Sequence, residues 1–203
     1  MNEITLVIIN VDVGFKNYQR LLKSMTDKQK EKAFAYKQEI DKIRSLISSY
    51  LINLLSKEEI SYKEKGKPYF AHGPFFNISH SGKYVIMAIA DKEVGVDIEE
   101  NIPKDMSMLI KIFNEAEAKV IKEHADFYYL WCAKESLIKC MGSSINHIKE
   151  IPSLPLNGLK TFKGVDYECQ TFIYDKHIIS ITRESKEPFT VNIKAFNKLP
   201  LEI

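Results

Sequence analysis

FFNISHSGKYVIMAIADKEVGVDIEE, residues 75–100, holds a polar segment followed by two apolar runs. The β-branched run Tyr84–Ala90 predicts a buried strand, and the shorter run Val94–Ile98 predicts another. The segment Asn77–Gly82 is interpreted as a loop, because small polar residues that end in a glycine are typical of turns. Its N–H and hydroxyl groups could cradle a phosphate. The stretch therefore predicts two neighbouring strands beside a polar loop.

Two carboxylates, Asp97 and Glu99, lie two residues apart in the second predicted strand. Because side chains alternate between the faces of a strand, both point to the same side and can share one cation. Most carboxylates in proteins are exposed, so the alternative is an ordinary solvated strand end. A second stretch of the chain helps to decide between these interpretations.

That second stretch is FYYLWCAKESLIKCMG, residues 127–142. Its apolar residues recur at steps of three and four, which predicts an amphipathic helix with one buried stripe. Trp131, Glu135 and Lys139 are spaced four residues apart and so lie at successive turns along one edge of this stripe. Lys134 falls near its middle, where an ammonium group must either reach a carboxylate or extend to solvent.

These stretches contain three blocks that resemble the signature blocks of the surfactin-type 4′-phosphopantetheinyl transferases: Asn-Ile-Ser-His-Ser-Gly, Val-Gly-Val-Asp-Ile-Glu and Trp-Cys-Ala-Lys-Glu-Ser-Leu-Ile-Lys. Each block alone is a weak signal. The three in this order, with a basic helical region and Gly-Lys-Pro upstream, make a strong one. The resemblance covers about residues 1–185.

The resemblance implies an α+β fold with two similar halves related by a pseudo-twofold axis, with helices packed on a small antiparallel sheet in each half. The halves would be residues 1–101 and 102–203, with the segment Asn101–Lys104 as the hinge and the active site in the cleft between them. A chain of two such halves is expected to be a pseudo-dimeric monomer.

The remaining sequence pattern agrees with a mixed fold. A strand is predicted over residues 3–11, an irregular turn over 12–16, and two helices between Met25 and Leu54 with Thr26 as the first cap. Near the end of the chain, alternating patterns predict antiparallel strands at residues 161–162, 167–174, 177–182 and 189–196.

Composition sets limits on partners and compartment. The formal net charge of the chain is +2, so any anion site must come from local clustering, and neither nucleic acid nor a membrane is an expected partner. The first apolar run is too short for a signal sequence or a membrane span. The odd number of cysteines has no metal-type spacing. We therefore expect a protein of the reducing cytoplasm.

Local chemistry alone leaves most candidate coenzyme A contacts with ordinary alternatives: a solvated basic face, a simple Lys-x-Lys-Pro loop and a turn histidine. The resemblance instead implies that these residues bind coenzyme A, and it assigns Lys32, Arg44, Ser45, Gly66, Lys67, Pro68, Ser79, His80 and Lys139. Gln29 departs from the family pattern, because related proteins often carry a basic residue there. One phosphate contact is then either missing or supplied by Lys28.

The resemblance also implies the reaction. Coenzyme A would donate its phosphopantetheine arm to a serine of an acyl or peptidyl carrier protein, releasing 3′,5′-ADP. Charge that builds on the phosphate requires a hard cation with oxygen ligands and a lysine. Asp97, Glu99 and Glu135 would hold Mg²⁺, and Lys139 would neutralise the diphosphate.

The general base is left open between Glu135 and Glu117, acting directly or through water. For Glu117 the plain alternative is a capping box with Asn114 at the start of a helix. Trp131 is expected to pack in the wall of the cleft, and Lys134 to anchor the carboxylates.

Three further alternatives remain at this stage. A metal-dependent phosphodiesterase would use the same carboxylates to activate water, and a non-catalytic protein would bind coenzyme A or a carrier without transfer. Separately, the apolar residues Met106, Met108, Leu109, Ile112 and Phe113 either pack in the core or form a docking face for a helical carrier.

Overall fold

The computed structural model describes residues 2–103, 105, 109–144 and 148–203 of the chain. Three residues about which the sequence made predictions lie outside this described part: Lys104 at the end of the expected hinge, and Met106 and Met108 of the possible docking face. Phe113 is described, and it is buried beside Phe127, as core packing requires.

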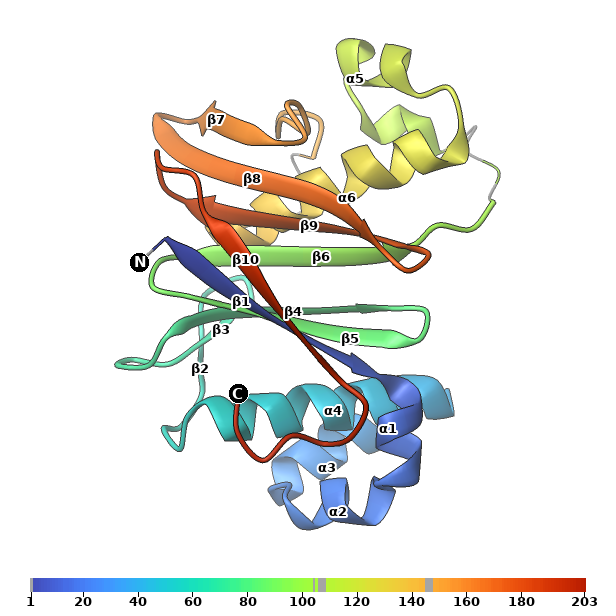
Figure 1. The fold of residues 1–203 in the computed structure, drawn as a ribbon, viewed down its shortest axis with the longest axis vertical. Helices are drawn as coiled ribbons and strands as arrows, with labels where there is room; N and C mark the ends of the chain where they lie inside the picture. The colour runs from blue at the N-terminus through green and yellow to red at the C-terminus, as the bar shows by residue number, and fades with distance from the viewer. Residues whose placement is uncertain (1, 104, 106–108, 145–147) are drawn as a thin grey trace.

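The first strand leads into a layer of four helices that lies below the sheets in Figure 1. These elements are β1 (Glu3–Asn10), α1 (Val11–Lys16), α2 (Tyr18–Lys23), α3 (Asp27–Phe34) and α4 (Glu39–Leu55). As predicted, Thr26 caps α3, in a capping box with Gln29.

The prediction of an irregular segment over residues 12–16 is wrong, because α1 occupies it. The Asn10 side chain caps this helix by accepting a hydrogen bond from Asp12 N at 2.9 Å. Gly14 lies against α4 so closely that a Cβ there would come within 2.6 Å of Ile43. Close packing against α4 thus explains a glycine inside this helix, despite the low helix propensity of glycine.

The first sheet has the order β10-β1-β5-β4, and its new strands are β4 (Phe75–Ser81), β5 (Tyr84–Ala90) and β10 (Thr190–Phe196). Strand β10 pairs with β1 in parallel, so the prediction that all the late strands are antiparallel is wrong for this strand. The predicted loop Asn77–Gly82 is also wrong, because most of it belongs to β4.

The second sheet has the order β6-β9-β8-β7 and is antiparallel throughout. Its strands are β6 (Val94–Glu100), β7 (Gly158–Phe162), β8 (Val165–Tyr174) and β9 (His177–Glu184). Helix α6 (His124–Met141) packs on this sheet, and a short helical turn, η1 (Leu109–Ile112), and α5 (Glu115–Val120) precede it. Two short strands, β2 (Ser61–Tyr62) and β3 (Pro68–Tyr69), form a separate ribbon.

The two sheets share one apolar core. Alternate residues of β1, such as Leu6 and Ile8, pack with Val96 and Ile98 of β6, whereas Val7 belongs to the core between the first sheet and the helical layer. Because both faces of β1 are buried, its sequence is an almost continuous apolar run. Among the described residues, no helix combines the length and apolar character needed to cross a membrane.

The mixed α+β architecture is confirmed. The order strand, helices, hairpin occurs twice along the chain, once from β1 to β5 and once from β6 to β9, and each time the first strand pairs with the second strand of the hairpin. The sheets do not divide at residue 101, however. Strand β6 from the first half lies in the second sheet, and β10 from the second half lies in the first sheet.

Candidate functional site

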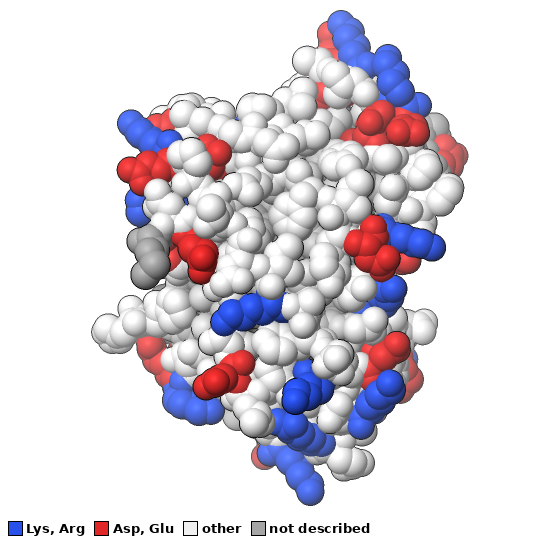
Figure 2. Space-filling model, in the orientation of Figure 1, with Lys and Arg blue, Asp and Glu red and all other residues white. Residues whose placement is uncertain are grey.

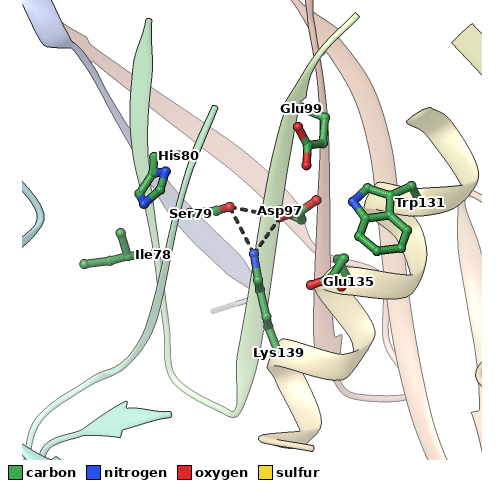
Figure 3. Close-up of a pocket in the computed structure, with 8 residues that line it drawn as sticks. All are labelled: Ile78, Ser79, His80, Asp97, Glu99, Trp131, Glu135 and Lys139. Carbon is green, nitrogen blue, oxygen red and sulfur yellow. Dashed lines mark hydrogen bonds and ion pairs between the residues drawn. The ribbon is translucent and has the colours of Figure 1, made fainter. Parts of the chain in front are cut away.

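A pocket of about 270 Å³ opens where β4, β6 and α6 meet, as Figure 3 shows. Its lining comes from all three elements and comprises Ile78, Ser79, His80, Asp97, Glu99, Trp131, Glu135 and Lys139. The three carboxylates expected to hold a metal ion thus lie in one pocket with the lysine expected to neutralise the diphosphate.

Strand β4 holds β6 through side chains that alternate along it. Asn77 Oδ1 accepts a hydrogen bond from Val96 N at 2.9 Å, and Ser79 Oγ donates to Asp97 Oδ1 at 2.9 Å. Ser81 Oγ donates in the same way to Glu99 Oε2 at 2.9 Å. These polar residues sit at every second position, as a strand requires, and they orient both carboxylates of β6.

The charged centre of the pocket is the pair Asp97 and Lys139. Lys139 Nζ lies 2.6 Å from Asp97 Oδ1 and also donates to Ser79 Oγ at 3.0 Å. Asp97 is only 3% exposed, yet its Oδ2 has no hydrogen-bond partner among the residues that the structure describes. A buried carboxylate oxygen of this kind is costly to leave unpaired, so it is suited to receive a ligand or a cation.

Helix α6 presents Glu135 and Lys139 one turn apart, which brings both into the pocket. Desolvation raises the pKa of Glu135, and the nearby Asp97 and Glu99 raise it further against the opposing effect of Lys139. Desolvation lowers the pKa of Lys139, but Asp97 and Glu135 outweigh it, so the net pKa is raised. Lys139 is therefore held as a cation at neutral pH.

The donor set of the pocket fits Mg²⁺, because it consists of carboxylate oxygens with one unpaired oxygen among them. The described part of the chain contains no group of three His, Cys, Asp or Glu side chains already close enough to hold a metal ion. The assignment of Asp97, Glu99 and Glu135 as metal ligands therefore remains a prediction.

The predicted coenzyme A contacts near the pocket are His80 and Arg44. His80 lies on β4 at the pocket, where partial desolvation of its ring together with the positive charge of Arg44 lowers its pKa. Arg44 is ion-paired with Asp41 at 2.8 Å and donates to the Gly82 carbonyl at the β4–β5 turn. Ser45, next on α4, is half-buried.

Lys32 lines a different cavity of about 590 Å³, between α3, α4 and residues 56–62. Lys28 and Gln29 line it as well, but the Gln29 amide is already used by the Thr26 cap and by Asn53, to which it donates at 2.8 Å. Figure 2 shows Lys and Arg gathered over the helical layer with Asp and Glu among them. Lys28 lies on the same cavity as Gln29, and its role as the replacement for the missing basic residue stays a prediction.

The segment Gly66–Pro68 lines a third cavity, of about 210 Å³, with its Gly66 and Lys67, and this cavity also contacts Lys139 and Ile78. Gly66 has a φ of +84°, which a turn of this kind reserves for glycine. Pro68 begins the short strand β3. The ammonium of Lys67 is buried and bonded within the protein. The prediction that Gly66, Lys67 and Pro68 form a wall of the coenzyme A pocket stays a prediction.

Glu117 lies apart from these pocket residues. It forms the predicted capping box with Asn114, accepts hydrogen bonds from Ser153 N and Oγ at 2.8 and 2.7 Å, and pairs with Lys134 Nζ at 2.8 Å. Desolvation opposes the charged form, but Lys134 and Ser153 hold the pKa of Glu117 below its usual value. The prediction that Lys134 anchors the pocket carboxylates is therefore wrong.

Two residues of the site were not singled out from the sequence. Asn77 holds β6 beside β4, and Ile78 lines the pocket wall. The signal for Asn77 was present, because Asn77, Ser79 and Ser81 alternate with apolar or aromatic residues at the period of a strand.

Comparisons with known proteins identify the family of the chain. A model of the 4′-phosphopantetheinyl transferase superfamily matches residues 93–190. The 4′-phosphopantetheinyl transferase gsp of Aneurinibacillus migulanus is 33% identical over 186 residues, covering 84% of this chain and 71% of that protein. The 4′-phosphopantetheinyl transferase Sfp of Bacillus subtilis strain 168 is 30% identical over 176 residues, covering 78% and 75%. The chain therefore belongs to the 4′-phosphopantetheinyl transferase superfamily and is an enzyme of that class.

Proposed function

We propose that this enzyme transfers the 4′-phosphopantetheine group of coenzyme A to a serine of an acyl or peptidyl carrier protein, in a Mg²⁺-dependent reaction that releases adenosine 3′,5′-diphosphate. The observation that carries the proposal is a single pocket combining carboxylates, an ammonium, a hydroxyl and an imidazole: Asp97, Glu99, Glu135, Lys139, Ser79 and His80.

The reaction is a substitution at the phosphorus atom that bears pantetheine. The serine oxygen of the carrier forms a new P–O bond, the bond from that phosphorus to the bridging oxygen breaks, and adenosine 3′,5′-diphosphate leaves with the bridging oxygen. Negative charge spreads over the phosphoryl oxygens and the leaving group. Lys139, ion-paired but half-buried at the pocket wall, offsets part of this charge.

Asp97, Glu99 and Glu135 would hold Mg²⁺, which when bound stabilises charge on phosphate oxygens. The unpaired Oδ2 of Asp97 supports this assignment, since a cation would satisfy it. The hydrogen bonds from Ser79 and Ser81 keep the two β6 carboxylates directed toward the pocket.

We assign the general base to Glu135, acting directly or through one water. A carboxylate with a raised pKa is a better proton acceptor, and desolvation raises the pKa of Glu135 in the metal-free pocket. The pKa of Glu117 is lowered, and its two oxygens are already bonded to Lys134, Ser153 and Asn114. These contacts support Glu135 over Glu117 as the base.

Coenzyme A would extend from this pocket along β4 and α4. We assign its diphosphate to Ser79, His80 and Lys139, its phosphate and adenine end to Lys32, Arg44 and Ser45, and a wall of its pocket to Gly66, Lys67 and Pro68. The positive charge of Arg44 acts on His80, which supports a continuous path between the first two of these groups. For Lys67 we propose that only the backbone contacts coenzyme A, because its ammonium group is bonded within the protein.

Two further features support the proposal: the repeated order of elements and the state of the cysteines. The repeated order of elements supports two pseudo-symmetric halves in a monomer, with the pocket between β4 of one sheet and β6 of the other. Cys132, Cys140 and Cys169 are buried and unbridged, which supports action in a reducing compartment such as the cytoplasm.

The test is mass spectrometry of several apo-carrier proteins incubated with coenzyme A and either Mg²⁺ or a chelator. The proposal expects a metal-dependent gain of one phosphopantetheine arm on a carrier serine, and release of adenosine 3′,5′-diphosphate that requires the carrier. Release without a carrier would instead indicate a phosphodiesterase. Binding of coenzyme A or carrier without any mass gain would indicate a non-catalytic protein.

A further inference from the structure

The side chain of Lys67 is nine-tenths buried, and its ammonium group has three acceptors. Lys67 Nζ donates to Glu93 Oε2 at 2.7 Å, to the Val94 carbonyl at 2.9 Å and to the Cys140 carbonyl at 2.9 Å. An ammonium has three N–H donors, so all of them are used. The ammonium group of Lys67 is therefore fully hydrogen-bonded within the protein, and no N–H donor is left for a phosphate.

The Cys140 carbonyl belongs to the last turn of α6, where the helix leaves carbonyl groups without partners. The left-handed cap at Gly142 satisfies the carbonyls of Ile138 and Lys139. Lys67 supplies the partner for the next carbonyl and places a cation at the negative end of the helix. The loop that precedes β3 thus completes the C-terminal cap of α6.

The second carbonyl, that of Val94, is at the start of β6. Here β6 and α6 touch backbone to backbone, since a Cβ on Gly95 would lie 2.0 Å from the Ser136 carbonyl. The Cys140 thiol adds a contact with the Glu93 carbonyl at 3.3 Å. Lys67 is bonded to both elements at this junction.

The junction lies close in sequence to the pocket residues on both elements. Asp97 follows Val94 by three residues on β6, and Lys139 immediately precedes Cys140 on α6. Their ion pair of 2.6 Å depends on how far α6 is displaced along β6. A bond that ties Val94 to Cys140 therefore fixes the distance on which that ion pair depends.

We propose that Lys67 is a positioning residue for the transfer reaction, which clamps the end of α6 to the start of β6 and so sets Lys139 against Asp97. This inference rests on the proposed function for its kinetic consequences. The clamp itself is a property of the fold, and it replaces the assignment of the Lys67 side chain as a ligand of coenzyme A.

Lys63 provides a matched control, because its ammonium pairs with the same Glu93 carboxylate, through Oε1. No bond from Lys63 to the carbonyls of Val94 or Cys140 is found among the described residues. Lys67→Met should lower kcat by about tenfold to hundredfold, as a small misplacement of reacting groups does. Lys63→Met should leave kcat within about threefold of wild type, as expected for a partly exposed ion pair.

Calorimetric titration with adenosine 3′,5′-diphosphate separates positioning from binding. The proposal expects Lys67→Met to bind this nucleotide with near-wild-type affinity and to show an unchanged KM for coenzyme A. A large loss of nucleotide affinity with kcat retained would overturn the proposal and restore Lys67 as a ligand. Lys67→Arg, which keeps charge and donors, should recover part of kcat.

Amide hydrogen exchange tests the clamp without any activity measurement. Residues 136–142 at the end of α6 should exchange faster in Lys67→Met than in Lys63→Met or wild type. Equal protection in both variants would overturn the clamp, even if wild type proved inactive on every carrier. Should Lys67→Met fail to fold, Lys67→Gln, which keeps two N–H donors and removes the charge, undergoes the same comparison.

Discussion

Helix α6 carries two lysine–carboxylate pairs, and they differ in how fully their atoms are used. Lys134 Nζ lies 2.8 Å from Glu117, and Lys139 Nζ lies 2.6 Å from Asp97. In the first pair both oxygens of Glu117 accept further hydrogen bonds, and Lys134 also donates to the carbonyls of Ile148 and Ile151. In the second pair one oxygen of Asp97 has no partner among the described residues.

This difference separates a structural ion pair from a functional one. A buried pair with every donor and acceptor used holds the protein together and has nothing to offer a ligand. A pair that keeps a buried oxygen unpaired at a pocket wall is less stable alone and gains from binding. Proximity of charges alone would not have distinguished the two pairs.

The largest effect is expected from breaking the pair of Glu117 and Lys134, in which every donor and acceptor is used. Glu117→Gln leaves the ammonium of Lys134 buried without its counter-charge, so the free energy of unfolding should fall by about 3–5 kcal/mol. Urea denaturation measures this loss. The double variant Glu117→Gln with Lys134→Met should lose less than the single one. A loss below about 1 kcal/mol would mean that the pair is no more than a surface-type contact.

Breaking the pair of Asp97 and Lys139 should change the transfer activity more than the stability of the protein. Asp97→Asn removes the charge that faces the pocket, and transfer should slow by about 10²–10³-fold, or about 2.7–4 kcal/mol. Rates on apo-carrier, measured beside urea denaturation of the same sample, check both parts. Full transfer activity in this variant would refute the assignment of Asp97.

The role of Glu135 can be tested through the pH dependence of the transfer rate. A base acts only when ionised, so transfer should be present above the pKa of Glu135 and lost as pH falls through it. Without a metal ion that pKa is raised above the ordinary 4.5 by desolvation, and bound Mg²⁺ would lower it, so the acidic limb of the rate profile should shift to lower pH as the Mg²⁺ concentration rises. Glu135→Gln should lower kcat by about 10²-fold and abolish this limb. An unchanged acidic limb would exclude Glu135 as the base.

Ser79→Ala should have the smallest of these effects. The serine donates to Asp97 and accepts from Lys139, and loss of a hydrogen bond to a charged group costs about 1.5 kcal/mol, or roughly tenfold in kcat. Ser81→Ala, which loses the corresponding bond to Glu99, is the matched variant. Equal losses of kcat in both variants would show that the hydrogen bond to Asp97 matters no more for transfer than the one to Glu99.

Local patterns predicted the local features well. Strand β5 begins and ends where the apolar run does, at Tyr84 and Ala90, and the caps at Thr26 and Asn114 form as their side chains suggested. The grouping of Asp97, Glu99 and Glu135 in one pocket followed from the resemblance of three blocks to a known family. Such features depend on neighbours in the chain or on a shared ancestry.

The features that were missed depend on distant residues. The polar side chains of β4 suggested a loop because their partners, Val96, Asp97 and Glu99, lie on another strand. Strand β10 alternates like any late strand, and only the return of the chain to β1 makes it parallel. Lys134 was expected beside the pocket, because its sequence position does not reveal that Glu117 is its partner.

The central claim is that Asp97, and not Glu117, belongs to the divalent-cation site. Electron paramagnetic resonance can follow Mn²⁺, as a stand-in for Mg²⁺, in titrations of wild type, Asp97→Asn and Glu117→Gln with coenzyme A present. Our account predicts cation binding by wild type and by the folded fraction of Glu117→Gln, and at least tenfold weaker binding by Asp97→Asn, about the 1.4 kcal/mol that a tenfold change represents. Undiminished binding by Asp97→Asn, or its loss in folded Glu117→Gln, would contradict it.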